Sequence, residues 1–217
     1  MARMNDTADR SGGPLRLGVL LSGGGRTLLN LLDEARAGRL NAEVAVVIAS
    51  RDCQGVERSR DAGLDVHVVP YKQMPDAETY SARIAELLDA AKADLVCLAG
   101  FLSMWIIPDR YQGRVMNIHP ALLPSFGGKG MWGHHVHEAV LAAGCKVSGC
   151  TVHFVTNEYD AGPIVVQKAV AVVEGDTPDA LAARIFEQEC LAYPEAIRLF
   201  GEGRLRIEDR AVRVSPA

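Results

Sequence analysis

The chain has 217 residues, of which 48% are hydrophobic and 23% are charged. These fractions are typical of a globular protein and exclude disordered and fibrous classes. The length suits one large α/β domain with a full core. The net charge of −4 provides no basic surface for nucleic acid, so a small-molecule partner fits better.

The five cysteines are an odd number without a pairing pattern, and no secretory segment precedes the first apolar run. These features predict a reducing, cytoplasmic location. The longest apolar runs fall far short of the ~20 residues that a membrane helix needs, so we expect no membrane association. Residues 1–14 are polar and predict a flexible leader before a folded domain over 15–217. Monomer and homodimer both remain open.

Apolar runs of strand length alternate with segments of helical period along the first half of the chain. Residues 15–21 read as a strand, 27–37 as a helix and 43–50 as a second strand, which together make a βαβ unit. A turn-rich piece then leads to a short strand over 65–69. An amphipathic helix marked by Tyr80 and Ile84 follows, and 94–99 reads as a buried strand.

The second half continues this alternation. A short aromatic segment over 101–107 precedes a strand at 115–119, and the glycine-rich stretch 121–133 is expected to be mobile. The further elements expected are a helix over 134–143, strands over 148–156 and 163–172, a helix over 178–200 kinked near Pro194, and marginal strands at 204–208 and 212–214. This order predicts a single-domain, Rossmann-like α/β fold whose mostly parallel sheet carries helices on both faces.

The first candidate site is the glycine-rich loop Ser22-Gly23-Gly24-Gly25-Arg26-Thr27, between a predicted strand and a predicted helix. Glycines let the backbone approach a ligand closely, and the N–H groups that open a helix bind anions. The spacing matches neither a dinucleotide fingerprint nor a Walker motif, so a phosphate monoester is favoured. A tight turn that needs glycine for geometry alone explains the loop about as well.

The second candidate site combines Asn117, His119 and Asp160. Asn117 and His119 are two residues apart, so on a straight strand they face the same side. An amide and an imidazole can polarise a carbonyl group, and a carboxylate can manage a proton. The alternative is a capping Asn and a buried core His. The Asp160-Ala161-Gly162-Pro163 turn tips the balance toward function, because a carboxylate is costly to bury without a partner.

Weaker signals lie between these motifs. The spacing of His134 and Glu138 could hold a metal, but no further ligand is evident, so we expect no metal site. Met131 and Trp132 lie in the 127–133 part of the glycine-rich loop and could close over a flat ligand.

The segments 22–27, 98–101, 117–124, 149–155 and 160–163 together resemble the phosphoribosylglycinamide formyltransferase family. The resemblance extends from about Leu15 to Leu205. It implies transfer of a formyl group from 10-formyltetrahydrofolate to the amine of glycinamide ribonucleotide, in purine biosynthesis. The signatures around His119 and Asp160 are shared with other folate-dependent formyltransferases and hydrolases, whereas the glycine-rich loop and the compact single domain favour this acceptor.

The resemblance also implies a set of site residues. Asn117, His119 and Asp160 would be catalytic, Gly25, Arg26 and Thr27 would hold the phosphate, and Glu189 would contact the glycinamide. Folate would lie against Phe101, Leu102 and Trp105 and beneath Thr156, Asn157, Glu158 and Tyr159. Two departures are Arg26-Thr27, where the family often has Ser-Asn, and Ser103, where it has an arginine.

The mechanism expected from these residues is direct transfer without a metal or a covalent enzyme intermediate. The amine attacks the formyl carbon, Asn117 and protonated His119 stabilise the oxyanion, and Asp160 orients His119 and accepts the amine proton. The alternatives are hydrolysis of the formyl donor, transfer to another amine, and a non-catalytic folate- or nucleotide-binding protein.

Overall fold

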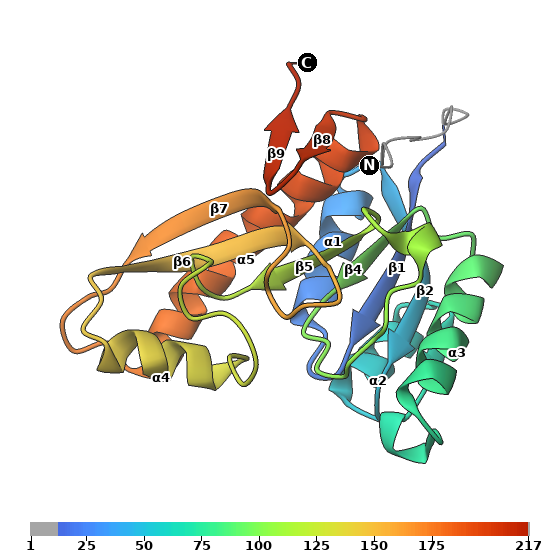
Figure 1. The fold of residues 1–217 in the computed structure, drawn as a ribbon, viewed down its shortest axis with the longest axis horizontal. Helices are drawn as coiled ribbons and strands as arrows, with labels where there is room; N and C mark the ends of the chain where they lie inside the picture. The colour runs from blue at the N-terminus through green and yellow to red at the C-terminus, as the bar shows by residue number, and fades with distance from the viewer. Residues whose placement is uncertain (1–12, 217) are drawn as a thin grey trace. The chain divides into compact units, whose positions relative to one another are not determined.

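The computed structural model describes residues 13–216, so the expected leader over 1–14 lies almost entirely outside the described residues. The chain divides into two compact units, Met1–Met116 and Asn117–Ala217, which are described separately. Over the described residues, nine strands form a hydrogen-bonded sheet in the order β3-β2-β1-β4-β5-β6-β7-β9-β8 (Figure 1). The expected α/β class with a mostly parallel sheet is therefore confirmed.

The first unit is built from parallel strands joined by helices. Its elements are β1 (Leu15–Leu21), α1 (Arg26–Arg36), β2 (Ala42–Ala49), α2 (Gln54–Asp61), β3 (Val66–Val68), η1 (Tyr71–Gln73), α3 (Ala77–Ala90), β4 (Leu95–Leu98) and η2 (Asp109–Tyr111). β1 pairs in parallel with both β2 and β4, and β2 pairs in parallel with β3. The strands consist of long apolar runs, as expected for strands covered on both faces.

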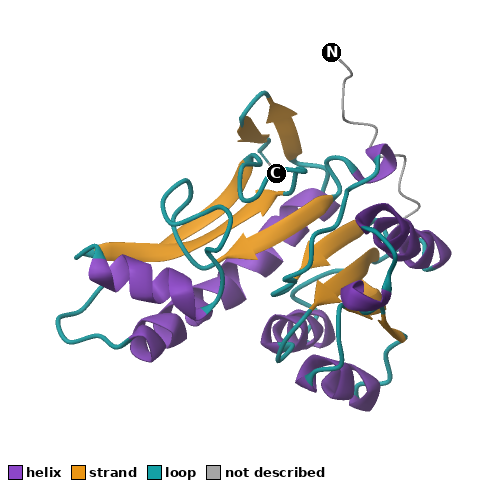
Figure 2. Ribbon diagram, turned by 60° about the horizontal axis from the view of Figure 1, so that its bottom comes forward, coloured by secondary structure: helices purple, strands orange, loops and turns teal. Residues whose placement is uncertain are grey.

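Right-handed crossovers determine where the helices of this unit lie. The chain steps outward from β1 to β2 to β3 and then returns to β4 beyond β1, which places α1 and α2 on one face of the strands and α3 on the other. Figure 2 shows these strands between helices on the two sides. The carboxyl ends of β1 and β2 therefore meet at one edge, where α1 and α2 begin.

The structure corrects the sequence prediction at α2, which lies in the piece expected to be rich in turns. Val56 is its one large buried residue, and Gly55 and Ser59 are buried with it. A short helix that packs through small residues carries too narrow an apolar stripe to show helical periodicity.

The second unit follows β5 (Val115–His119), which crosses the boundary between the units. Its elements are α4 (His134–Ala142), β6 (Val147–Phe154), β7 (Ile164–Ala171), α5 (Pro178–Gly201), β8 (Leu205–Glu208) and β9 (Ala211–Val214). β6 and β7 form an antiparallel pair, and α5 packs along them (Figure 2). α5 continues through the buried Pro194 as one helix, and Thr177 caps its start by accepting a hydrogen bond from the Ala180 N–H.

Candidate active site

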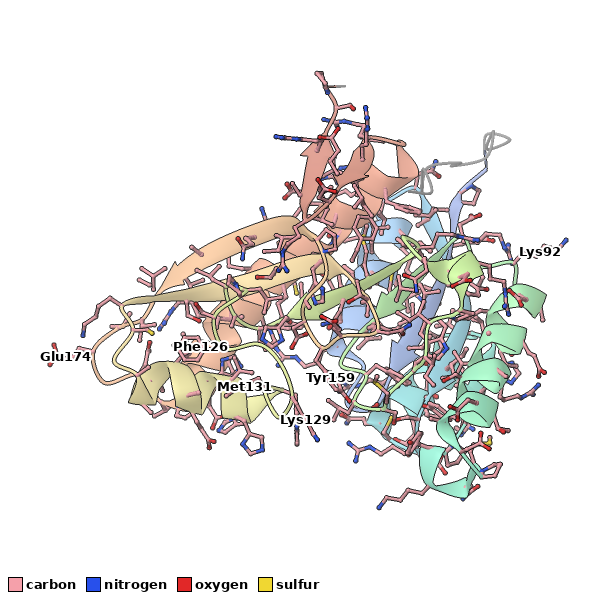
Figure 3. The ribbon with its side chains drawn as sticks, viewed as in Figure 1. Lys92, Phe126, Lys129, Met131, Tyr159 and Glu174 are labelled. Atoms are coloured by element: carbon pink, nitrogen blue, oxygen red, sulfur yellow. The ribbon has the colours of Figure 1, made fainter. Side chains whose placement is uncertain are left out.

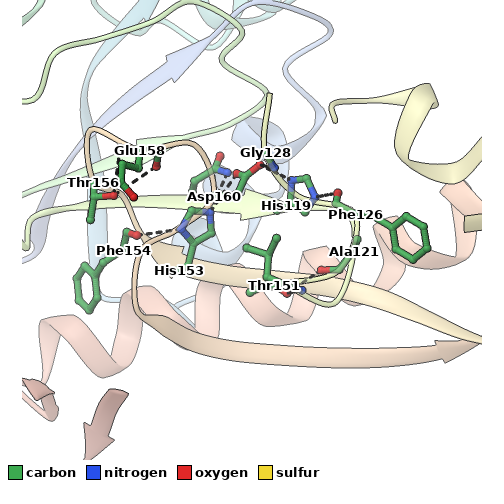
Figure 4. A network of polar contacts seen from close by, with 12 residues as sticks. His119, Ala121, Phe126, Gly128, Thr151, His153, Phe154, Thr156, Glu158 and Asp160 are labelled. Carbon is green, nitrogen blue, oxygen red and sulfur yellow. Dashed lines mark hydrogen bonds and ion pairs between the residues drawn. The ribbon is translucent and has the colours of Figure 1, made fainter. Parts of the chain in front are cut away.

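His119, His153 and Asp160 of the second unit gather where β5, β6 and the turn after β6 meet (Figure 4), and Asn117 contacts His153 there. Asn117 and His119 lie on β5, His153 lies on β6, and Asp160 lies on the turn between β6 and β7. His119 and His153 are almost completely buried, and the Asp160 side chain is 14% exposed. The structure therefore brings together the three residues selected from the sequence and adds a fourth, His153.

His119 is held by a hydrogen bond at Nε2 and faces a carboxylate at Nδ1. Its Nε2 lies 2.8 Å from the Phe126 carbonyl oxygen, which can only accept, so Nε2 carries a hydrogen and donates. Its Nδ1 faces Asp160 Oδ2 at 3.7 Å. Burial lowers the pKa of His119 below its usual value, although the Asp160 charge and the Phe126 contact act in the opposite direction. The imidazolium expected from the sequence is thus not the form that the free site favours at neutral pH.

Asp160 lies between the two imidazoles. Its Oδ1 is 3.6 Å from His153 Nε2, and its Oδ2 accepts a hydrogen bond from the Gly128 N–H at 2.9 Å. Burial by itself would raise the pKa of this carboxyl, but the His153 contact, the His119 ring and the Gly128 N–H outweigh it and lower the pKa. Asp160 is therefore an ionised acceptor at neutral pH.

His153 orients the amide of Asn117. Its Nδ1 lies 2.9 Å from the Phe154 carbonyl oxygen and donates to it, which leaves Nε2 as an acceptor. Asn117 Nδ2 donates to this Nε2 at 3.2 Å. The amide nitrogen has a second hydrogen that can point to a substrate oxygen. In the sequence, His153 lay within the segment 149–155 that resembles the family, but alternation along β6 does not mark it, because a register shift between Val152 and His153 interrupts the pattern.

Two glycines, Gly127 and Gly162, allow backbone segments to approach this cluster closely. A Cβ at Gly162 would lie 1.7 Å from the Phe154 carbonyl oxygen, so only glycine permits the tight turn after Asp160. A Cβ at Gly127 would lie 3.2 Å from the Asp160 Cβ and closer still to Leu123. Asp160 itself has φ of 51°, a left-handed conformation that Asp adopts more readily than most residues.

The glycine-rich segment 121–133 connects β5 to α4. Figure 3 shows Phe126, Lys129 and Met131 along this segment and Tyr159 on the turn between β6 and β7. Trp132 is 49% exposed and its ring makes an edge contact with His135. The segment thus presents an aromatic side chain to solvent and contributes the Phe126 carbonyl and the Gly128 N–H to the polar cluster.

The candidate phosphate loop lies in the first unit, between β1 and α1. Gly25 has φ of 72° and precedes α1 without a side-chain cap, so the loop opens a helix whose first N–H groups suit an anion. A Cβ at Gly25 would lie 2.9 Å from Gly55 Cα in α2. The Gly55 N–H donates to the Gly23 carbonyl oxygen at 2.9 Å, so α2 braces the loop.

Two arginines that were not selected from the sequence also brace this loop. Arg51 Nε donates to the Ser22 carbonyl oxygen at 2.7 Å, and Arg58 Nη1 donates to that of Gly24 at 2.5 Å. Ser22 further accepts at its Oγ from the Leu102 N–H at 2.9 Å. The loop and the segment that contains Phe101 and Leu102 therefore lie side by side in this unit.

The residues expected to contact folate differ in exposure. Leu102 is 48% exposed and Tyr159 is 56% exposed, so both are accessible. Trp105 is 5% exposed, and its Nε1 donates to the Ser81 carbonyl oxygen at 3.3 Å. This burial against α3 does not favour a direct contact between Trp105 and folate. In the second unit, Thr156 Oγ1 accepts a hydrogen bond from the Glu158 N–H at 3.3 Å. This contact closes the turn that contains Asn157.

Glu189 lies on α5. Its carboxylate is close enough to β6 to raise the pKa of the Cys150 thiol, which burial and this charge together bring to about 12.

Residues 13–216 contain no group of three or more His, Cys, Asp or Glu side chains arranged to hold a metal ion. No helix in that range is both long and apolar enough to cross a lipid bilayer.

The model of the formyl transferase family matches residues 15–197. This match covers most of the chain, and the polar cluster on β5 and β6 lies within it. The chain therefore belongs to the formyl transferase family.

Individual relatives within this family carry more specific names. The crystal structure of glycinamide ribonucleotide transformylase 1 from Symbiobacterium toebii is 45% identical, with a TM-score of 0.88 over 97% of this chain and 99% of that chain. Phosphoribosylglycinamide formyltransferase from Escherichia coli K12 is 35% identical over 89% of this chain and 90% of the relative. The chloroplastic phosphoribosylglycinamide formyltransferase of Arabidopsis thaliana is 37% identical over 91% and 69%, respectively. The chain also matches trifunctional purine biosynthetic proteins, of which it spans a fifth or less.

Proposed function

We propose that this protein transfers the formyl group of 10-formyltetrahydrofolate to the amine of glycinamide ribonucleotide, in cytoplasmic de novo purine biosynthesis. The observation that carries the proposal is the ionised Asp160 carboxylate between two buried imidazoles, with the oriented amide of Asn117 beside them. Such a cluster offers hydrogen-bond donors for a developing oxyanion and an acceptor for a proton. The names of the relatives support the choice of acceptor.

The reaction is a direct transfer. The amine nitrogen attacks the formyl carbon and forms the new C–N bond, and the bond from that carbon to N10 of the folate then breaks. The amine loses one proton and N10 gains one. Asp160 accepts the proton from the nitrogen of the tetrahedral adduct, which is positively charged and far more acidic than a free ammonium group.

Asn117 and His119 stabilise the oxyanion. Asn117 donates its second amide hydrogen, because His153 holds the first. His119 donates through Nε2, which carries a hydrogen in both protonation states. In the free protein this hydrogen is bound to the Phe126 carbonyl, so the oxyanion replaces Phe126 as the acceptor and the glycine-rich segment adjusts.

The remaining assignments concern binding. The phosphate of the acceptor binds at Gly25, Arg26 and Thr27, where α1 opens toward the anion. Folate packs against Phe101 and Leu102, while Trp105 is buried against α3. The turn residues Thr156, Asn157, Glu158 and Tyr159 contact the pterin, and Glu189 contacts the glycinamide.

One assay tests the proposal against its alternatives. The purified protein is incubated with 10-formyltetrahydrofolate, with and without glycinamide ribonucleotide, and formylated acceptor and formate are both quantified. We expect formylated acceptor with glycinamide ribonucleotide and little formate without it. Formate at the same rate in both reactions would establish a hydrolase instead, and the absence of both products would leave a binding protein.

A further inference from the structure

Thr151 and Gln167 form a polar pair across two strands of the second unit. Thr151 on β6 lies directly opposite Gln167 on β7 in the antiparallel register, so their side chains share one face. Gln167 Nε2 donates to Thr151 Oγ1 at 2.9 Å. Thr151 is fully buried, whereas Gln167 belongs to the exposed residues.

This pair holds the backbone from Ala121 to Leu123. Thr151 Oγ1 donates to the Ala121 carbonyl oxygen at 2.6 Å and accepts from the Leu123 N–H at 3.0 Å (Figure 4 shows the Thr151–Ala121 contact). Gln167 Nε2 donates its other hydrogen to the Leu123 carbonyl oxygen at 3.0 Å. A hydroxyl offers one donor and two acceptor sites, and an amide nitrogen offers two donors, so every such site in the pair is used.

Residues 121–123 lie between His119 and Phe126, and a hydrogen bond joins these two residues. The held backbone begins two residues after His119 and ends three residues before Phe126, whose carbonyl accepts from His119 Nε2. Two residues further on, the Gly128 N–H donates to Asp160. The Phe126 carbonyl orients the catalytic imidazole, and the Gly128 N–H orients the carboxylate. Both contacts therefore depend on the position of residues 121–123.

We propose that Gln167 is a positioning residue for the formyl transfer, acting with Thr151 to hold residues 121–123 so that Phe126 and Gly128 reach His119 and Asp160. The inference rests on the proposed function. Gln167 touches none of the four residues of the catalytic cluster through a described hydrogen bond, and its exposed position means that it buries little apolar surface. Its effect on the site passes through the backbone that it anchors.

The test replaces Gln167 with Met, which keeps the length of the side chain but removes both hydrogen bonds. Gln112→Met is the matched control, since Gln112 Nε2 also donates to a loop carbonyl, that of Ile107, in the other unit. Long-range ¹H–¹⁵N spectra of the full chain report the Nε2–H signal of His119, and steady-state kinetics report kcat and KM. Thermal unfolding establishes that each variant is folded.

We expect Gln167→Met to weaken the Nε2–H signal of His119 and to lower kcat by roughly 10- to 100-fold, as for a small displacement of a catalytic group, with little change in KM. Gln112→Met should retain both the signal and kcat. Thr151→Ser, which keeps the hydroxyl, should behave like the wild type, and Thr151→Val should behave like Gln167→Met.

A folded Gln167→Met with the wild-type His119 signal and wild-type kcat would overturn the proposal. Should Gln167→Met fail to fold, equal His119 signals in Thr151→Ser and Thr151→Val would overturn it. The spectra need no substrate, so they test the clamp even if the wild type transfers no formyl group, an outcome that would reject the proposed function alone.

Discussion

At the scale of single residues, the candidate site depends on how Asp160 keeps its charge. A carboxylate with 14% exposure would normally be pushed toward its protonated form, but two imidazoles and one backbone N–H reverse that effect and lower its pKa. A carboxylate of low pKa is a weak base. It can therefore accept a proton only from an acidic group, such as the charged nitrogen of a tetrahedral adduct.

Asp160→Asn tests this role. The amide keeps the volume and can still hydrogen bond, but it cannot accept the amine proton. We expect kcat to fall by ~10²–10⁴ while KM for both substrates changes little, the usual cost of losing a general acid–base group. Asp176→Asn is the control, because Arg184 lowers the pKa of the Asp176 carboxyl to about 2 away from the cluster. Equal kcat in Asp160→Asn and the wild type would remove Asp160 from the chemistry.

At the scale of elements, the start of α1 is shaped by α2. Gly25 approaches Gly55 so closely that neither position tolerates a Cβ without movement, and Arg51 and Arg58 fix the loop carbonyls. These contacts turn the carbonyl groups of the loop toward protein donors. The start of α1 therefore suits an anion.

Gly25→Ala is predicted to raise KM for glycinamide ribonucleotide about tenfold or more and to leave KM for the folate donor nearly unchanged. The reason is that the displaced backbone loses hydrogen bonds to a charged phosphate, each worth roughly 1.5–3 kcal/mol. Gly38→Ala is the matched control: Gly38 also has a positive φ, just beyond the end of the same helix, but nothing lies near its Cβ position. Both variants carry the same backbone strain of roughly 1–2 kcal/mol. A similar KM in the two variants would argue against a phosphate site at Gly25.

At the scale of the whole molecule, buried histidines couple stability to pH. Burial lowers the pKa of His137, whose Nδ1 has no hydrogen-bond partner in the structure, and burial lowers that of His119 as well. The unfolded chain, with an ordinary histidine pKa of about 6.5, binds protons first as pH falls. The stability is therefore fully present above that value and is lost as pH falls through the lower folded pKa.

His137→Phe is expected to reduce this pH dependence. The aromatic ring fills much of the same volume without a titrating group, so the difference in Tm between pH 7.5 and pH 5.5 should shrink while the contribution of His119 remains. Thermal unfolding of the variant and the wild type at several pH values measures the effect. An unchanged difference in Tm would show that protonation of His137 does not limit the stability.

Much of the element order was predictable because it depends on local patterns. The βαβ start, the antiparallel pair of strands and the helix from Pro178 follow from periodicity and capping over short stretches of sequence. α2 was missed because its contacts are made by small residues and its stability comes from packing. Arg51 and Arg58 were missed for a related reason, since their partners lie about 30 residues earlier in the chain.

For the candidate site, the sequence by itself determined which residue types are present and on which local elements they lie. Asn117 and His119 share one face of a strand, and a carboxylate lies on a glycine-proline turn. Only the tertiary structure decided the protonation chemistry. The lowered pKa of His119, the place of His153 and the clamp by Gln167 arise from burial and from hydrogen bonds between residues that are distant in sequence. Local patterns record which backbone conformation a residue prefers, whereas desolvation and hydrogen bonding depend on which groups the completed fold brings together.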